Sequence, residues 1–380
     1  MWSPQANRSA DLAIVGAGIM GLAHAYAAAK RGLRVVVFDR HCQAMGASVR
    51  NFGMIWPIGQ PNGDMHRLAL RSREVWLEVL KETGLPFRPE GSLHVAYRDD
   101  EARVGREFAD RAPGLGYECV WLNPGQVLDR TNAVQPEGLL GGLFSPLELT
   151  IDPGRTISAL KEFLSEQHNV AFRFGCPVIR IDLPRVESSL EIWNVDRAIV
   201  CSGEDFETLF PDAYRDAGMT RVKLQMMRTQ TQPDGWQLGP ALAAGLTLRF
   251  YPSFQICESL EALKQRIAAE TPEYDRWGIH GLVSQTSMGE LTLGDSHEYG
   301  LNTEVFDKEE IDLLILRYLR GFLKAPDLAI AQRWHGVYAK HPSSPYLTLE
   351  PQPGVKIVTS PGGSGMTLSF GIGEKTLAEL

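Results

Sequence analysis

The stretch "DLAIVGAGIMGLAHAYAAAKRGLRVVVFDR", residues 11–40, decides the fold class of this 380-residue chain. Residues 12–15 are a short apolar run ended by glycine, as in a strand buried on both faces. Residues 19–30 are rich in alanine, have helical composition and are followed by Gly32. Residues 33–39 predict a second buried strand. The stretch therefore predicts one βαβ unit with parallel strands.

The turn between the first strand and the helix contains the pattern GxGxxG, formed by Gly16, Gly18 and Gly21. The first glycine permits a tight turn, the second lets the backbone approach a pyrophosphate, and the third packs the helix on the strand. Asp39 ends the second strand, where a carboxylate can accept hydrogen bonds from a ribose diol and repels a 2′-phosphate. The unit predicts binding of a dinucleotide other than NADP, and it leaves NAD and FAD open.

Composition sets the broad class of the protein. Hydrophobic residues make up 44% of the chain, charged residues 22%, and the net charge is −8. These values indicate a globular protein of about two domains, with no positive field for nucleic acid or anionic membrane. Five scattered cysteines show no metal-ligand spacing and fit a reducing compartment. Because neither a signal peptide nor a membrane span is evident, we expect a cytoplasmic protein with a small-molecule substrate and no metal.

Two further segments favour a flavin over NAD. Residues 40–63 are rich in glycine and small polar residues, where an NAD domain usually continues with short β-α units. Residues 360–374, "SPGGSGMTLSFGIGE", form a second glycine-rich turn before a helix. A helix N-terminus aimed at the pyrimidine side of an isoalloxazine stabilises the negative charge of a reduced flavin.

The rest of the chain alternates between helical and strand patterns. Asp152 and Pro153 predict the cap and first turn of a helix. Helices are expected over 65–84 and 152–169, and strands over 91–97, which alternates, 170–175, and 197–203, which is apolar. Strands of an antiparallel sheet are expected over 222–232, 246–252, 278–285 and 289–295, and a strand, glycine turn and helix over 355–380. These elements predict a mixed α/β fold in which two domains interleave along the chain.

At this point the chain resembles the glycine oxidase, sarcosine oxidase and D-amino-acid oxidase family of FAD-dependent oxidoreductases, over almost its whole length. The resemblance rests on the opening stretch, on "GASVRNFGM" and on "IDPGRTISAL" before "VAFRFGCPVIRI". It also rests on "RAIVCSGEDF", "RWHGVYAKHP" and "SPGGSGMTLSFGIGE". It implies a Rossmann-like FAD-binding domain with a parallel sheet, and a substrate domain built on an antiparallel sheet with helices. We expect the FAD-binding domain to comprise 1–88, 150–221 and 331–380, and the substrate domain 89–149 and 222–330.

The resemblance also implies which residues hold the cofactor. One group holds the ADP half, a second lines the pyrophosphate and flavin, and a third meets the adenine and the pyrimidine edge. In that order the residues are Gly16, Gly18, Ile19, Met20, Gly21, Asp39 and Arg40; Ala47, Ser48, Arg50, Asn51, Phe52, Gly53 and Met54; and Val178, Ser202, Gly203, Gly363, Ser364, Gly365, Met366 and Thr367.

The implied reaction is oxidation of a carbon–nitrogen bond. A small primary or secondary amine transfers hydride to flavin N5 and leaves as an imine, which water hydrolyses. The protein mainly orients the reacting C–H bond and excludes competing reactions, so no general base is assigned.

Three departures from the family pattern bear on the substrate and the acceptor. Glycine oxidase-like proteins carry a carboxylate-binding arginine in the segment where this chain has Tyr338, so a bidentate carboxylate clamp is not expected. Gly336 stands where monomeric sarcosine oxidases attach their flavin through cysteine, which predicts non-covalent FAD. Thr292 stands near the oxygen-activating lysine of those oxidases, so the acceptor, oxygen or another, stays open.

The segments "RNFGMIWPIGQP" and "RWHGVYAKHP" look like those of a subgroup associated with aminophosphonate breakdown. Tyrosine, histidine and lysine donors can surround a tetrahedral phosphonate as well as an arginine fork grips a flat carboxylate. The candidate substrate residues are Tyr338, His335, Lys340, Trp56, Arg249 and His280. An amino acid or hydroxy acid substrate remains an alternative, as does a flavin-binding subunit of a larger complex.

Overall fold

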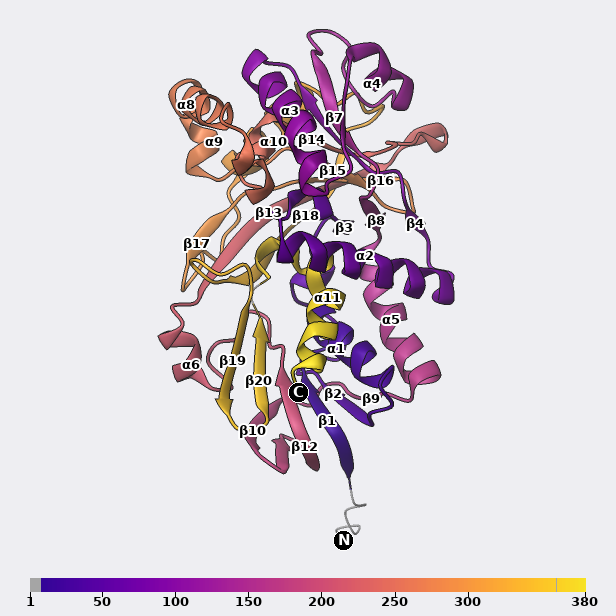
Figure 1. Cartoon of the computed structure of the whole chain (residues 1–380), viewed down its shortest axis with the longest axis vertical. Coiled ribbons are helices and arrows are strands. Elements are labelled where there is room, and N and C mark those ends of the chain that lie inside the picture. The colour runs from indigo at the N-terminus through magenta and orange to yellow at the C-terminus, as the bar shows by residue number, and fades with distance from the viewer. Residues whose placement is uncertain (1–7, 360) are drawn as a thin grey trace.

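The computed structural model describes residues 8–359 and 361–380 of the chain. Residues 1–7, on which the expected absence of a signal peptide rests in part, lie outside the described residues. Ser360, at the start of the second glycine-rich turn, lies outside them as well. Two large sheets occupy opposite ends of the molecule, the parallel one at the bottom of Figure 1 and the mostly antiparallel one at the top. The mixed α/β fold with parallel and antiparallel sheets that the sequence predicts is confirmed.

The first sheet is built around the opening βαβ unit. Strand β1 (Ser9–Val15) pairs in parallel with β2 (Val35–Phe38) on one side and with β12 (Ile192–Val200) on the other. The parallel set continues to β9 and β20, and an antiparallel hairpin extends it. The remaining strands are β9 Ala171–Arg173, β10 Val178–Asp182, β11 Arg185–Ser188, β19 Leu347–Gln352 and β20 Val355–Thr359.

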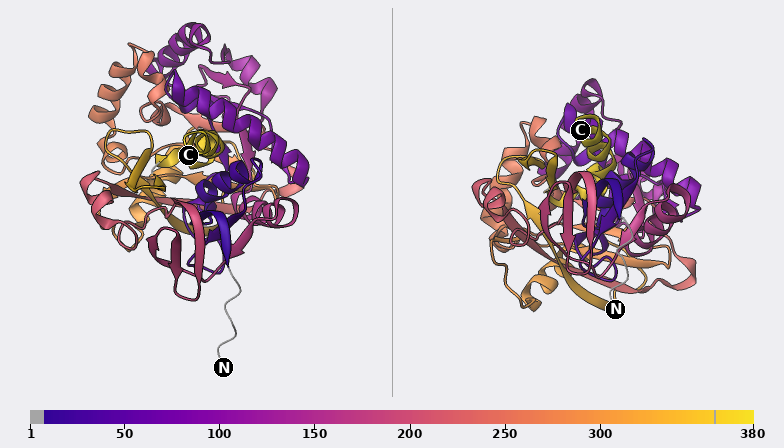
Figure 2. Two further views of the ribbon diagram at one scale, coloured as in Figure 1. Left: turned by 60° about the horizontal axis from the view of Figure 1, so that its bottom comes forward. Right: turned by 90° about the horizontal axis from the view of Figure 1, so that it is seen from below.

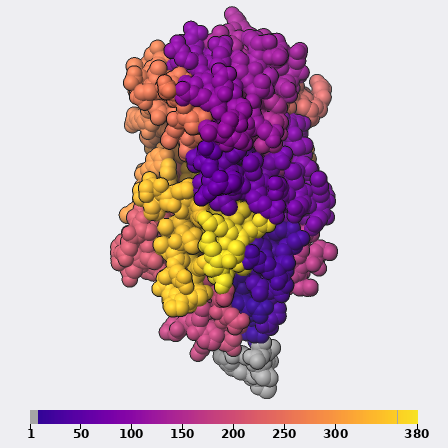
Figure 3. Space-filling model, in the orientation of Figure 1, coloured from indigo at the N-terminus to yellow at the C-terminus, as the bar shows by residue number. Residues whose placement is uncertain are grey.

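Four helices pack beside this sheet. Helix α1 (Ile19–Ala29) and the last helix, α11 (Gly365–Ala378), lie side by side, and α2 (Asp64–Thr83) packs against α11. Their indigo, purple and yellow ribbons gather in both views of Figure 2, and the space-filling view of Figure 3 shows the yellow C-terminal segment against the indigo N-terminal one. Helix α5 (Pro153–His168) begins as predicted, with the Asp152 carboxylate accepting from Arg155 N at 3.4 Å. The two glycine-rich turns therefore meet although they stand at opposite ends of the sequence.

The second sheet has a long central pair. Strand β13 (Thr220–Thr231) runs antiparallel to β18 (Ile330–Lys340), so β18, which the sequence-based division assigns to the FAD-binding domain, lies in the second sheet. Its other strands are β5 Ser92–Ala96, β6 Val120–Leu122, β7 Gly141–Ser145, β14 Ala241–Ala244, β15 Leu282–Gln285, β16 Glu290–Gly294 and β17 Glu298–Gly300. A small sheet of β3 (Met54–Ile55), β4 (Phe87–Arg88) and β8 (Leu149–Ile151) stands between the two.

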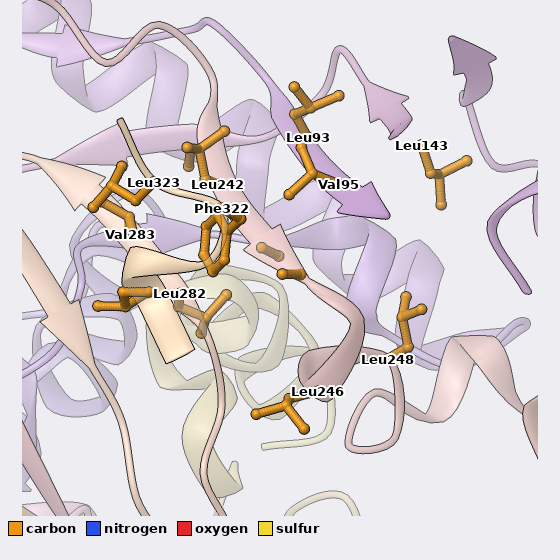
Figure 4. Close-up of a cluster of buried hydrophobic side chains, with 14 of the residues drawn as sticks. Leu93, Val95, Leu143, Leu242, Leu246, Leu248, Leu282, Val283, Phe322 and Leu323 are labelled. Atoms are coloured by element: carbon orange, nitrogen blue, oxygen red, sulfur yellow. The ribbon is translucent and has the colours of Figure 1, made fainter. Parts of the chain in front are cut away.

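A single hydrophobic core joins the second sheet to its helices. Leu93, Leu242, Leu282 and Phe322 come from different elements and converge in Figure 4, each at most 4% exposed. The other helices are α3 Asp99–Arg111, α4 Pro124–Arg130, α6 Pro211–Asp216, α7 Gly245–Leu248, α8 Leu260–Glu270, α9 Pro272–Arg276 and α10 Glu309–Arg320.

Of the strands expected in the middle region, the one over 246–252 is wrong, and the one over 278–285 is correct only in part. Residues 246–252 form no strand, because after β14 the chain turns through the short helix α7. Its Gly245 packs so closely on Glu101 that a Cβ would lie 2.1 Å from that carboxylate oxygen. Strand β15 begins only at Leu282, so neither Arg249 nor His280 sits in a strand as expected. Packing overrides the alternating pattern here.

Across the described residues, no helix is both long and apolar enough to cross a bilayer.

Candidate active site

The first glycine turn is held by contacts that leave no room for a side chain. Gly16 has a φ of +106°, and a Cβ there would lie 2.3 Å from the carbonyl oxygen of Cys201. A Cβ on Gly21 would lie 1.8 Å from the Gly16 oxygen, so helix and strand approach directly. At Gly18 the nearest atom to a Cβ is Ser48 Oγ, at 3.0 Å. The turn is thus built for close backbone approach.

The Asp39 carboxylate ties the end of β2 to this turn. Its Oδ2 accepts from Ala17 N at 2.8 Å, and its Oδ1 accepts from His41 N at 2.9 Å. The neighbouring Arg40 forms an ion pair with Asp205, which the sequence did not predict. The carboxylate is fixed at the end of β2, where the ribose hydroxyls of a dinucleotide are expected.

The segment "GASVRNFGM" is fixed on both sides. Ser48 Oγ accepts from Ile19 N at 2.9 Å, at the start of α1. The Asn51 side chain donates to Ala47 O at 2.8 Å and accepts from Gly53 N at 2.8 Å, so the loop closes on itself. These bonds set the loop beside the N-terminus of α1.

The same segment also reaches the second sheet. Arg50 donates to the carbonyl of His335 at 3.2 Å, and the Trp334 indole donates to the carbonyl of Arg50 at 3.3 Å. Both His335 and Trp334 belong to β18. The loop therefore links the two large sheets at the place where the cavity passes between them.

One cavity of about 560 Å³ runs past both glycine turns, a size typical of cofactor and ligand sites. Twenty of the predicted cofactor residues line it. They are Gly16, Gly18, Ile19, Met20, Asp39, Arg40, Ala47, Ser48, Arg50, Asn51, Phe52, Met54, Val178, Ser202, Gly203, Gly363, Ser364, Gly365, Met366 and Thr367. Gly21 and Gly53 do not line it, since each packs against backbone instead. The closely approached turn, the fixed carboxylate and the continuous cavity fit a dinucleotide such as FAD.

The end of the cavity beyond the second glycine turn is walled by the second sheet. Tyr338 and Lys340 from β18 line it, together with Trp56 and His280. A Cβ on Gly363 would lie 3.6 Å from the Tyr338 hydroxyl, so that hydroxyl stands against the second glycine turn. Four of the six candidate substrate residues therefore share one cavity wall.

The other two candidates lie elsewhere. His335 does not line the cavity: its Nδ1 bonds Asp307 Oδ1 at 2.9 Å, on a partly exposed part of β18. Arg249 is also absent from the lining. It pairs with Asp275 and donates to the carbonyls of Leu246 at 3.0 Å and Ile279 at 3.2 Å. Its charge therefore stabilises the packing of the second sheet's helices and loops.

Gly336 and Thr292, where the chain departs from the family pattern, differ in their position relative to the cavity. Gly336 lines the cavity, and a Cβ there would lie 3.2 Å from Leu224 and 3.3 Å from the Arg50 carbonyl. Thr292 is 2% exposed inside β16 and does not line the cavity.

Sequence reasoning missed four polar residues of this wall: Tyr251, Asp295, His297 and Tyr299. Asp295 and His297 follow β16 directly, in "GDSHEY". An aspartate and a histidine two residues apart at the end of a strand were the available signal.

Burial sets the protonation of the wall. It lowers the pKa of His297 to about 4, and it lowers the pKa of His280 well below its ordinary value, helped by the charges of His297, Arg249 and Lys340. It raises the pKa of Tyr338 well above its ordinary value and lowers the pKa of Lys340. Burial also raises the pKa of Asp295 to about 7, so this carboxyl is only partly ionised at neutral pH. The imidazoles are uncharged and the phenol keeps its proton, so the wall offers neutral donors and acceptors beside Lys340 and Asp295.

Comparison with known proteins agrees with this geometry. The chain is 30% identical over 144 residues to a glycine oxidase of Geobacillus kaustophilus, an alignment that spans 36% of this chain and only 38% of that protein. It is 22% identical over 348 residues to one of the subunits of an opine oxidase from Agrobacterium tumefaciens, covering 87% of this chain and 82% of that protein.

Comparison with solved structures finds proteins of the same fold. The crystal structure of glycine oxidase from Geobacillus kaustophilus superposes with a TM-score of 0.76 at 18% identity, covering 98% of this chain and 94% of that one. The family model of FAD dependent oxidoreductases, abbreviated DAO, matches residues 11–380. The predicted cofactor, FAD, is therefore confirmed, and the chain belongs to the DAO family of FAD-dependent oxidoreductases.

Proposed function

We propose that the enzyme oxidises a small primary or secondary amine to an imine, which water then hydrolyses to a carbonyl compound. The observation that carries the proposal is the single cavity that joins the FAD cradle to a polar wall of tyrosine, histidine and lysine. When bound, FAD supplies the hydride acceptor.

The wall has the groups needed to orient such a substrate. The Tyr338 hydroxyl, beside the second glycine turn, hydrogen-bonds the substrate close to the reacting carbon. Trp56 and Tyr251 stack at 6.2 Å between ring centroids and add an aromatic surface to the same wall. An oriented C–H bond in a site shielded from water is the main demand of this reaction.

For the substrate we propose an aminoalkylphosphonate or its N-methylated derivative. The arginines that line the cavity are Arg40 and Arg50, both in the FAD cradle, so the substrate wall of the described residues has no arginine fork. Lys340, Tyr338 and His280 instead reach the cavity, a mixed set of donors that suits a tetrahedral anion better than a flat one.

We further propose that the FAD is held without a covalent bond, because Gly336 offers no side chain for attachment. All five cysteines are free thiols, which suits a reducing compartment such as the cytosol. The electron acceptor is oxygen or a second redox partner.

Two alternatives have a specific basis. An amino acid substrate is favoured by the similarity to a glycine oxidase, and the role of a flavin-binding subunit by the longer alignment with a protein that is itself a subunit of an opine oxidase. Oxidation of a hydroxy acid on the same fold is the remaining alternative.

Product analysis separates these functions. The FAD-loaded protein is incubated with a dye acceptor and 2-aminoethylphosphonate, its N-methyl derivative, glycine, sarcosine or lactate. We expect ammonia or methylamine, with the matching carbonyl compound, from the phosphonates at the highest kcat/KM. Equal or faster turnover of glycine would replace the phosphonate assignment, keto acid from lactate alone would overturn the amine assignment, and turnover only with a partner protein would favour the subunit role.

A further inference from the structure

Three residues of the substrate wall form a compact polar cluster that the proposed chemistry does not use in full. They are His280, Asp295 and His297, and one potential ligand atom of each lies within 4.8 Å of the others. All three line the cavity. The first two are 6% exposed, and the His297 side chain is 10% exposed.

The cluster is buried without satisfying its own polar atoms. Both ring nitrogens of His280 and the Oδ1 of Asp295 have no hydrogen-bond partner. The separations between His280 Nδ1 and Asp295 Oδ1, and between His297 Nε2 and Asp295 Oδ2, are 4.0 Å each, too long for hydrogen bonds. Because buried polar groups normally have hydrogen-bond partners, we expect a ligand to lie between these atoms.

The ring of His297 is oriented as a metal ligand is. Its Nδ1 lies 3.0 Å from the carbonyl of Gly278, which places the proton on Nδ1 and leaves the Nε2 lone pair toward Asp295. The ring of His280 is held by stacking on Phe250, with 3.8 Å between centroids. Backbone and aromatic contacts thus fix both imidazoles.

We propose that His280, Asp295 and His297 bind one divalent transition-metal ion of the zinc or cobalt type. Two neutral imidazoles and one carboxylate are a common ligand set for such ions. Around a tetrahedral ion at about 2.1 Å, ligand atoms stand roughly 3.4 Å apart. The two 4.0 Å separations therefore need to close by about half an ångström, and the widest separation in the cluster, at most 4.8 Å, by at most about 1.4 Å. Three protein ligands leave at least one coordination position open.

The other buried histidines among the described residues lack these features, and His66, for example, stacks on Tyr117. His94 also has two unpartnered nitrogens, but its ring packs against Trp56 and Phe254 and does not line the cavity. His24 bonds the carbonyl of Met20 at 2.6 Å within its own helix. Burial of a histidine alone does not define the site, whereas three convergent ligands at the cavity do.

The open position gives the ion a role in substrate binding, a step that rests on the proposed function. A divalent ion with one carboxylate ligand leaves a net positive charge, which adds to that of Lys340 at the same wall. An anionic oxygen of the substrate, such as a phosphonate oxygen, completes the coordination. The amine end then points back toward the FAD cradle.

Metal uptake tests the site without any turnover. FAD-loaded protein, freed of metal with a chelator, is dialysed against Zn²⁺, and bound zinc is counted by mass spectrometry. We expect one ion per chain, with affinity reduced by at least about a hundredfold in H280F, which keeps the ring stack on Phe250, and in D295N. The matched control is H335Q, which changes a histidine outside the cavity and leaves zinc binding unchanged.

Co²⁺ gives an independent readout if a variant loses FAD or fails to fold. In the unaltered protein, Co²⁺ bound by two imidazoles and a carboxylate gives visible d–d bands at wavelengths beyond the flavin absorption. Absence of a bound ion, or zinc uptake that is the same in H280F and D295N as in the parent, overturns the site. Addition of methylphosphonate to the Co²⁺ form tests the substrate step: shifted bands support coordination, and unchanged bands refute it while the metal site stands.

Discussion

The two ends of the cavity are built in different ways. The cofactor end is organised around one local unit, β1, the glycine turn, α1 and β2, whose parts follow one another within residues 9–38. The loop at Ser48 and the second glycine turn add to this unit from elsewhere in the chain. The substrate end combines Trp56, Tyr251, the residues after β16, and the last residues of β18, which are far apart in sequence. A local unit tolerates little change but is easy to recognise, whereas a wall assembled from distant strands can change its chemistry one side chain at a time.

This difference predicts that the two ends can be damaged separately. The largest effect is expected for Gly18→Val, because its side chain enters the space beside Ser48 Oγ, 3.0 Å from a Cβ, where the pyrophosphate approaches. The purified variant should retain essentially no FAD, measured by absorbance after denaturation. Gly114→Val is the control, since a Cβ there meets nothing within 4 Å. A variant with one FAD per chain would contradict the cradle.

Tyr338→Phe should leave FAD binding intact and lower kcat/KM for the substrate. Loss of one hydrogen bond to a charged substrate reduces kcat/KM by about tenfold to a hundredfold, with FAD content unchanged. The control is Tyr26→Phe, whose buried hydroxyl has no partner and lies outside the cavity. Unchanged kcat/KM in Tyr338→Phe would remove the hydroxyl from the site.

Asp39→Asn should have a smaller effect, confined to the cofactor end. An amide replaces one carboxylate oxygen with an NH₂ group that faces the backbone N–H of Ala17 or His41. We expect FAD binding to weaken by about 1–2 kcal/mol, measured as the dissociation constant of FAD from reconstituted apoprotein. Equal affinity in the variant and the parent would show that the carboxylate does not face the cofactor.

His335→Gln should have the smallest effect, because this residue lies at neither end of the cavity. His335 bonds Asp307 away from the cavity, and Asp307 keeps Lys223 Nζ at 2.9 Å when the imidazole is removed. FAD content and kcat/KM should both stay within about twofold of the parent, since surface ion pairs contribute little. A tenfold loss of kcat/KM with normal FAD content would return this histidine to the substrate site.

The sequence predicted the secondary structure of the local unit at the cofactor end almost completely. The boundaries of β1, α1 and β2 agree with the expected 12–15, 19–30 and 33–39 to within three residues. This accuracy has a physical cause. Glycine spacing, buried strands and the terminal carboxylate are all requirements of one short unit, so each is visible in the same window of sequence.

The substrate end was predicted only in part. Tyr338 and Lys340 could be named because they lie in a recognised segment, but Asp295 and His297 reach the cavity only through the pairing of β16 with β13. The helices α8 and α9 were missed within a region read as strands. Arg249 shows the opposite error, since its charge suggested a ligand group whereas Asp275 and two backbone carbonyls use it. Such partners depend on long-range packing, which local patterns do not contain.

The central claim is that one cavity places an amine beside bound FAD. Anaerobic mixing of the FAD-loaded protein with single candidate substrates tests it most directly, because loss of the oxidised flavin absorbance needs no acceptor and no partner. We predict that 2-aminoethylphosphonate or its N-methyl derivative reduces the flavin faster than glycine, sarcosine or lactate does. Flavin that stays oxidised with every amine, or that only lactate reduces, would contradict the account.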